Sequence, residues 1–397
     1  MFFLAHMFPS FNNIMLHTPL SLLVIFETET THLKHNLLMD FIRMASFLLL
    51  IFCVKGLGKY ITWDDIKIHY EDNDHDYKKI TERLSFQNGD DGNQSRVIVV
   101  DQSGHADSRT IQAAVDMVPV NNSIRVKIYI LPGVYREKVM VPASKPYISF
   151  IGDPNHASET VLSWHDKASD RYKDGSELGT YRTASVTVES DYFCASDITI
   201  ENTVVAVPGG YKMQAVALRI TGNKAVFYRV RILGTQDTLL DETGSHYFYQ
   251  CYIQGSVDFI FGNARSLYKE CSLHSVADKY GAIAAHHRNS EGEDTGFSFV
   301  NCSVTGSGLA IFLGRAWGNY SRAVYSYCDI DNIIDPSGWS DWNQPWRQRT
   351  AVFGEYECRG KGADRKKRVS WSKSFGFEEA VHFLDTDFIG GKDWLRL

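Results

Sequence analysis

A short motif of aromatic, aliphatic and small residues recurs along the middle of this chain. The clearest copies occupy residues 227–232, 248–253 and 267–273, and weaker copies occupy 299–304 and 325–330. The first steps are roughly 20 residues long, which is the size of one turn of a parallel β-solenoid. A β-sandwich is the competing fold, but repeats in register at this step favour the solenoid. We therefore expect an all-β chain whose turns stack their apolar residues into one continuous core.

The remaining sequence suggests where this domain begins and ends. Short strand-like segments separated by Gly, Asn and Asp dominate from residue 96 onward. Residues 108–118 predict a short helix that caps the N-terminal end, and residues 377–384 predict a helical tail at the C-terminus. Residues 59–95 are polar and charged, so we interpret them as a solvated linker. The folded domain is expected to span residues 96–397.

The first 58 residues are interpreted as a targeting segment. Arg43, an apolar run over residues 44–54 and Lys55-Gly56 together have the basic flank, short apolar core and small residues of a secretory signal peptide around 39–58. The run is too short to cross a bilayer comfortably. The upstream residues are interpreted as a gene-model extension, and a signal anchor is the alternative. We expect a secreted protein.

Six cysteines follow the predicted signal peptide, an even number that is compatible with disulfides outside the cell. They are Cys194, Cys251, Cys271, Cys302, Cys328 and Cys358. None forms a CxxC pair, so no metal site is expected. Cys251 and Cys271 would occupy equivalent places on adjacent turns, which predicts a bridge between them. A ladder of buried free thiols is the alternative.

Charge excludes one class of function and restricts another. The formal net charge is −6, so there is no global basic field of the kind that nucleic-acid-binding proteins use. A polyanionic substrate would have to be held by local Lys and Arg side chains. The sequence carries no signal for oligomerisation, and we expect a monomer.

Two aspartates mark the candidate chemistry. Asp237 lies in Gly-Thr-Gln-Asp-Thr-Leu-Leu, and Asp258 lies in Gly-Ser-Val-Asp-Phe-Ile-Phe-Gly. They are 21 residues apart, so one solenoid turn would place them side by side. Two close carboxylates cannot both ionise easily, which predicts that one pKa rises. One proton donor beside one anion is the pair that acid/base or nucleophilic chemistry needs.

Two glutamines and an arginine extend this pattern. Gln214 precedes Gln236 by about one turn, so the two amides could donate hydrogen bonds to a developing oxyanion. A purely structural Gln ladder is the alternative. Arg315 could pair with Asp258 or bind a substrate carboxylate. Trp317 could stack on a sugar face.

These segments, in order, resemble the signature blocks of plant pectin methylesterases, and they are most similar to the QUARTET-type subgroup. The blocks are Gly133–Glu137, Gln214–Leu218, Gln236–Leu239, Asp258–Gly262 and Leu313–Trp317. The resemblance implies a right-handed parallel β-helix that hydrolyses C6 methyl esters of galacturonate in pectin and modifies cell walls.

The resemblance also implies a role for each site residue. It implies that Asp258 is the nucleophile, that Asp237 is the proton donor, and that Gln236 stabilises the transition state. Gln214, Arg315, Trp317 and Thr180 correspond to substrate-binding positions. Family members need no cofactor. The implied partners are methyl-esterified homogalacturonan and proteinaceous pectinesterase inhibitors, and the implied location is the extracellular cell wall.

The sequence departs from the family pattern in three places. Ala316 replaces a common proline, which affects only the stiffness of a turn. His286 and His287 stand where many members carry Gln-Gly, and they could change the local charge near pH 6. The residues before Arg96 are too few and too poor in helical patterning for an inhibitor-like domain, so no autoinhibitory domain is expected.

Two other functional classes remain open from the residues. A pectin-backbone glycosidase or lyase would share the solenoid, and a glycosidase would also use paired aspartates. A glycosidase would not need the amides of Gln214 and Gln236, and a lyase would be expected to carry an acidic calcium site and a basic catalytic residue. A catalytically silent wall-binding protein would not need an intact set of Asp237, Asp258 and Arg315.

Overall fold

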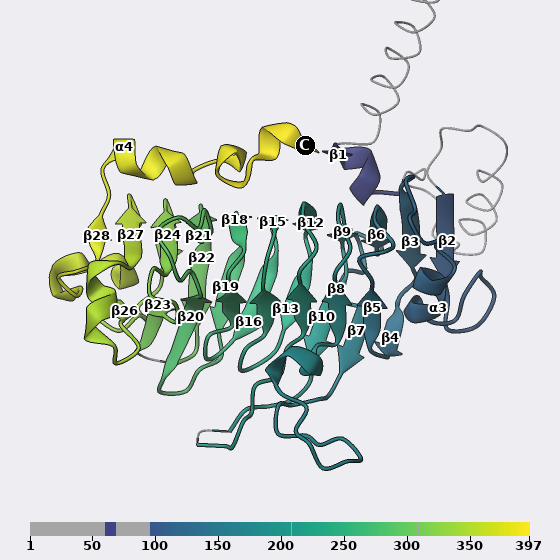
Figure 1. The fold of residues 1–397 in the computed structure, drawn as a ribbon, viewed down its shortest axis with the longest axis horizontal. Helices are drawn as coiled ribbons and strands as arrows, with labels where there is room; N and C mark the ends of the chain where they lie inside the picture. The colour runs from purple at the N-terminus through teal and green to yellow at the C-terminus, as the bar shows by residue number, and fades with distance from the viewer. Residues whose placement is uncertain (1–59, 69–95, 208, 309) are drawn as a thin grey trace, which may run out of the picture. The chain divides into compact units, whose positions relative to one another are not determined.

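The computed structural model describes residues 60–68 and 96–397, except residues 208 and 309, and it confirms the parallel β-helix (Figure 1). Within these residues the chain winds through three long sheets, and every strand pair in them is parallel. We name each sheet by a central strand: the β14 sheet, the β15 sheet and the β16 sheet. Neighbouring strands of a sheet come from successive coils, so residues that stack on each other are separated by about one coil of sequence.

The β14 sheet contains β5 (Val139–Val141), β8 (Val186–Val188), β11 (Leu218–Ile220), β14 (Leu239–Asp241), β17 (Ile260–Gly262), β20 (Gly281–His286), β23 (Ile311–Ala316) and β26 (Trp339–Ser340). The β16 sheet contains β4 (Gly133–Arg136), β7 (Thr160–Trp164), β10 (Thr199–Asn202), β13 (Arg231–Leu233), β16 (Tyr252–Gly255), β19 (Ser272–Ser275), β22 (Ser303–Gly306) and β25 (Asp329–Ile330). The β15 sheet contains β2 (Arg96–Val100), β3 (Val126–Ile130), β6 (Ile148–Ile151), β9 (Cys194–Ser196), β12 (Ala225–Tyr228), β15 (Ser245–Tyr249), β18 (Arg265–Lys269), β21 (Gly296–Val300), β24 (Arg322–Ser326), β27 (Val352–Tyr356) and β28 (Lys373–Ser374).

Aromatic rings stack inside the helix at the repeat positions. Phe227 lies on Phe248 with ring centroids 4.8 Å apart, and Phe248 lies on Tyr268 at 4.5 Å. The column continues through Phe299 to Tyr325 at 4.8 and 4.4 Å. These rings are fully buried. Burial of large aromatic rings is a dominant source of core stability, so the repeat seen in the sequence is the core of the fold.

The predicted bridge between Cys251 and Cys271 is wrong, and the alternative holds. All six cysteines in the described residues are free thiols. Cys251 donates to Phe227 O, and Cys271 donates to Phe248 O, so each thiol bonds to the preceding coil. In-register parallel strands keep equivalent side chains about 4.8 Å apart. That spacing exceeds the roughly 3.8 Å between Cβ atoms that a disulfide prefers.

A helix caps the N-terminal end as expected, and several short helices follow the last coil. The cap is α3 (Ile111–Asp116), with Thr110 rather than Ser108 as the N-cap. The C-terminal helices are α4 (Phe377–Ala380) and the 3-10 helices η6 (Val381–Phe383), η7 (Thr386–Ile389) and η8 (Gly391–Asp393). They run along the β15 sheet (Figure 1). Four further 3-10 helices are η2 (Thr180–Thr183), η3 (Pro345–Arg349), η4 (Lys361–Ala363) and η5 (Arg365–Lys367).

Part of the expected linker belongs to the folded unit. β1 (Ile61–Thr62) pairs in parallel with β29 (Leu395–Arg396), and the 3-10 helix η1 (Trp63–Ile66) follows it. Ile61 and Ile66 are fully buried against the β15 sheet and the C-terminal helices. The prediction that residues 59–95 form a linker is therefore wrong for this segment. Its apolar side chains lie outside the repeat and next to the charged residues that follow, so no periodic pattern marks them.

The predicted targeting segment, residues 1–58, lies outside the described residues. Among the helices of residues 60–68 and 96–397, none is long and apolar enough to cross a membrane.

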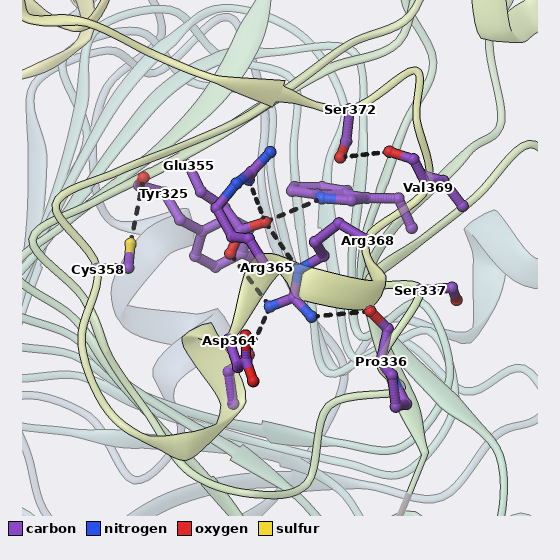
Figure 2. A network of polar contacts seen from close by, with 12 residues as sticks. Tyr325, Pro336, Ser337, Glu355, Cys358, Asp364, Arg365, Arg368, Val369 and Ser372 are labelled. Carbon is purple, nitrogen blue, oxygen red and sulfur yellow. Dashed lines mark hydrogen bonds and ion pairs between the residues drawn. The ribbon is translucent and has the colours of Figure 1, made fainter.

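A buried carboxylate anchors the segment that follows the last long coil. Glu355 in β27 is only 3% exposed. Arg365 donates to Glu355 Oε1 at 2.7 Å, and Arg368 donates to both carboxylate oxygens at 2.9 and 3.1 Å (Figure 2). Arg368 also donates to Pro336 O at 3.2 Å. These bonds hold the segment from η4 to Arg368 against the C-terminal end of the β-helix.

We expect Glu355→Ala to lower the free energy of unfolding by roughly 3 kcal/mol, because removing one partner of a buried ion pair leaves the other charge uncompensated. Urea denaturation followed by fluorescence measures this. Glu378→Ala, at an exposed position in α4, is the matched control and should change stability by less than about 0.5 kcal/mol. Equal stability of the two variants would contradict this account of the C-terminal end.

Candidate active site

Coil stacking brings the two predicted aspartates together. Gln236 and Val257 pair as a parallel bridge, and the backbone N–H of Asp237 donates to Val257 O at 3.0 Å. Asp237 and Asp258 are therefore equivalent residues on adjacent coils. Each lies just before a strand of the β14 sheet, Asp237 before β14 and Asp258 before β17. This confirms the predicted juxtaposition of the two carboxylates.

Both aspartates occupy a strained backbone conformation. Asp237 has φ 61° and Asp258 has φ 49°, in the left-handed region. Such residues cost of order 1–3 kcal/mol and cluster at functional sites, although Asp tolerates this region better than most residues. Gly255 makes the second turn possible, since a Cβ there would lie 2.1 Å from Cβ of Phe259. Gly234 has the same place before Asp237, where a Cβ would lie 2.7 Å from Thr238 Oγ1, so both turns need a glycine.

Arg315 distinguishes the two carboxylates. Its Nε donates to Asp258 Oδ1 at 2.8 Å, and its Nη2 makes a second short bond to Oδ2. Tyr280 accepts from Arg315 Nη1 at 2.8 Å, and the Trp342 ring lies 3.7 Å from the guanidinium. In the described residues, no side chain donates a hydrogen bond to Asp237. The bidentate pair therefore fixes the charge and the direction of Asp258 alone.

The electrostatic environment separates the two pKa values. Burial and the charge of Asp258 raise the pKa of Asp237 well above its usual value, with Arg315 opposing. Burial also raises the pKa of Asp258, but the hydrogen bonds and charge of Arg315 lower it. The arrangement therefore favours an ionised Asp258 beside a protonated Asp237. The two-aspartate pattern predicts this pair, in which one carboxyl group is an anion and the other is an acid.

The two glutamines also occupy equivalent positions. The N–H of Ala215 donates to Gln236 O at 3.0 Å, which puts Gln214 one coil before Gln236. No hydrogen bond joins the two side-chain amides in the described residues, and Gln214 Oε1 is buried without a partner there. A structural Gln ladder therefore has no support in these contacts. The amides remain candidates for binding an oxyanion.

The structure links Thr180 to this region through its neighbours. Thr180 begins η2, and its carbonyl accepts from the Thr183 hydroxyl at 2.7 Å. The Thr183 oxygen in turn accepts from the Val216 N–H at 2.8 Å, two residues beyond Gln214. The turn that carries Thr180 is therefore tied to the coil that carries Gln214.

Trp317 follows β23 on the outer side of the β14 sheet. Its ring lies 6.0 Å from Phe261 and 4.1 Å from His287, measured between centroids. Phe261, Leu240, Val216, Ala285 and Ala184 form an apolar cluster that Trp317 and Trp342 partly cover. Trp317 is thus held at the edge of an apolar surface that begins three residues beyond Asp258.

Comparison with known proteins identifies the family. The Pectinesterase family model matches residues 97–392. Pectinesterase QRT1 of Arabidopsis thaliana is 62% identical over 347 residues, which cover 86% of this chain and 91% of the relative. The chain belongs to the pectinesterase family. It is an ester hydrolase that de-esterifies pectin, and its similarity to pectinesterase QRT1 confirms the expected subgroup.

Other relatives agree with this assignment. Putative pectinesterase 11 of Arabidopsis thaliana is 46% identical, and the match covers 76% of this chain and 81% of the relative. The solved structure of a pectin methylesterase from carrot is 33% identical, with a TM-score of 0.70 and coverage of 77% of this chain and 96% of the carrot chain. The β-helix expected from the sequence is therefore the fold of this pectinesterase.

The sequence of this pectinesterase did not predict a buried polar network at the end of β14. Asp241, at the end of β14, lies 2.5 Å from His246 Nδ1 and accepts from the Tyr268 hydroxyl at 2.6 Å. His246 Nε2 bonds to Gly222 O at 2.7 Å. Tyr280 and Trp342, which hold Arg315, were missed as well. Asp241 lies on the same coil as Asp237, but Tyr268, Tyr280 and Trp342 come from other coils or loops, so only the fold reveals these contacts.

We expect Asp237→Asn to stabilise the folded protein at pH 7. A carboxyl whose folded pKa is raised binds more protons when folded, so stability is lost as pH rises from the unfolded pKa through the folded one. Asn cannot ionise, so the variant avoids this loss of stability, which is about 1.4 kcal/mol for each unit of pKa shift. It also tolerates the left-handed backbone.

Urea denaturation at pH 7 and pH 4 measures the effect. The stability advantage of Asp237→Asn should be present at pH 7 and should shrink at pH 4. Asp278→Asn, at an exposed position, is the control. A variant that is less stable than the wild type at pH 7 would contradict the raised pKa of Asp237 in the folded protein.

Proposed function

We propose that this pectinesterase hydrolyses the C6 methyl esters of homogalacturonan through a covalent intermediate on Asp258. The observation that supports it is the ion pair of Asp258 with Arg315, beside an Asp237 that has a raised pKa. An ionised carboxylate can attack the ester carbonyl, and a protonated neighbour can supply the leaving group with its proton. No metal or cofactor takes part in the proposed steps.

In the first step, an oxygen of Asp258 bonds to the ester carbon, and the carbonyl oxygen gains negative charge. Gln236 and Gln214 donate hydrogen bonds to that oxygen. The bond to the methoxy group then breaks, and Asp237 gives its proton so that methanol leaves. This leaves an anhydride between Asp258 and the galacturonate carbonyl, with Asp237 ionised.

In the second step, Asp237 accepts a proton from water as the water oxygen attacks the anhydride. The bond to Asp258 breaks, the free galacturonic acid is formed, and Asp237 is again protonated. Arg315 keeps Asp258 positioned and ionised between cycles. Trp317 and Thr180 contact the sugar chain in this proposal, with Trp317 stacking on a ring face.

The setting of this activity is also proposed. The predicted signal peptide supports secretion to the cell wall, where the substrate would be methyl-esterified homogalacturonan. The solved structures similar to this chain include a pectin methylesterase in complex with a hexasaccharide. We further propose that the enzyme acts as a monomer and that proteinaceous pectinesterase inhibitors are partners.

Asp258→Asn should lower kcat for methanol release from methylated pectin by roughly a thousandfold or more, because it removes the nucleophile at nearly the same side-chain size. Asp278→Asn should retain wild-type activity. Polymer length, followed by size-exclusion chromatography, should not fall during wild-type turnover. Full activity of Asp258→Asn would overturn the mechanism, and shortening of the polymer would favour a glycosidase or lyase.

A further inference from the structure

The two histidines that depart from the family pattern have different positions in the structure. His286 ends β20, is fully buried and packs its ring edge-on against Phe297. Burial lowers the pKa of His286 to about 3, so it stays neutral at any working pH. His287 is the next residue and points to the other side of the β14 sheet, where it is only half-buried. Of this pair, only His287 is placed to change the charge of the outer surface.

His287 lies in the same row of side chains as Trp317. Its backbone N–H donates to Gly262 O at 2.7 Å, which fixes it beside the coil that carries Asp258. Its ring packs on the Trp317 ring at 4.1 Å, and Trp317 in turn contacts Phe261. A sugar that stacks on Trp317 would therefore have the imidazole of His287 within reach of its substituents.

The groups around His287 do not hold its imidazole in one protonation state. Burial lowers the pKa of His287, Glu293 opposes this, and Arg347 adds to it. Glu293 also accepts bonds from Asn263 and Ser290, and the remaining contact of the His287 ring is the Asn289 amide at 3.3 and 3.4 Å.

A cation beside this site is held in place. Arg347 in η3 donates to Ala316 O at 2.6 Å and to Asn319 Oδ1 at 3.3 Å. A fixed guanidinium and a titratable imidazole thus flank one tryptophan. Both would attract an anion, and neither is bonded to a carboxylate oxygen in the described residues.

We propose that His287 and Arg347 form a subsite beside Trp317 that recognises the carboxylate of a galacturonate that has already lost its methyl ester. This inference rests on the proposed function, because it names which sugar of the polymer lies next to the reacting one. Arg347 supplies a charge at every pH, and His287 supplies a second charge when it is protonated. The subsite therefore selects partly de-esterified pectin more strongly as the pH falls.

The sign of the pH effect follows from linkage. The imidazole is neutral in the free enzyme near pH 7, and a bound carboxylate raises its pKa because the opposite charge favours the protonated form. Binding then takes up a proton, so affinity increases as pH falls toward and below the pKa of His287. One unit of pKa shift corresponds to a tenfold change in affinity.

Calorimetric binding of an unmethylated hexagalacturonate tests the proposal. The ligand has no ester, so binding is measured apart from catalysis. Asp237 also loses charge as pH falls, so Asp237→Asn serves as the common background. In that background we expect affinity to rise several-fold, up to about tenfold, between pH 7.5 and pH 5. Adding His287→Gln should remove most of that rise, and adding His287→Lys should give strong binding already at pH 7.5.

The controls separate the subsite from a structural role. His274→Gln on β19, in the β16 sheet, should leave the pH response unchanged. If His287→Gln weakens binding equally at both pH values, His287 only supports Trp317 and the proposal is wrong. An unchanged pH response in His287→Gln would overturn it as well. Methanol release by the wild type, assayed in parallel, reports independently on the esterase mechanism.

Discussion

The in-register stacking of one coil on the next is the constraint on which the rest of this structure depends. A coil near 20 residues long returns the chain to the same position with the same side-chain direction, so equivalent residues meet about 4.8 Å from each other. Inside the helix this produces the column from Phe227 to Tyr325. On the outside of the β14 sheet it sets Asp237 beside Asp258. The same geometry thus supplies both the stability of the core and the proximity of the carboxylates.

Proximity alone would not distinguish the two aspartates. An arginine from another coil gives them different pKa values. Arg315 lies in β23, beyond β20 in the order of the sheet, and it reaches back to Asp258 with two hydrogen bonds. Burial penalises both carboxylates, but only Asp258 is compensated. Asp237 therefore retains a proton at a higher pH. Left-handed backbone and uncompensated burial at one small site are costs that the long apolar core offsets.

The sequence predicts what the repeat controls and fails where contacts are not periodic. The repeat copies and the spacing of Asp237 and Asp258 follow from residues that share one register. Arg315 is aligned with Phe261, three positions beyond Asp258, so its ion pair with Asp258 does not follow from the repeat. Ile61 and Ile66 pack on the β15 sheet from a segment that lies outside the repeat, so the linker interpretation failed there. The disulfide prediction used Cα spacing and ignored that stacked Cβ atoms stay too far apart. Tyr280 and Trp342 reach Arg315 from loops, where no pattern identifies them.

The distribution of one proton over the two carboxylates tests this account most directly. Carbon-13 labelling of aspartate, with Asp237→Asn and Asp258→Asn used to assign the two carboxyl signals, allows each group to be titrated in the wild-type enzyme. The account predicts that Asp237 titrates well above its usual pKa and above Asp258. If Asp258 held the proton while Asp237 was ionised, Arg315 would not set the roles of the two aspartates, and the mechanism would have to be reversed.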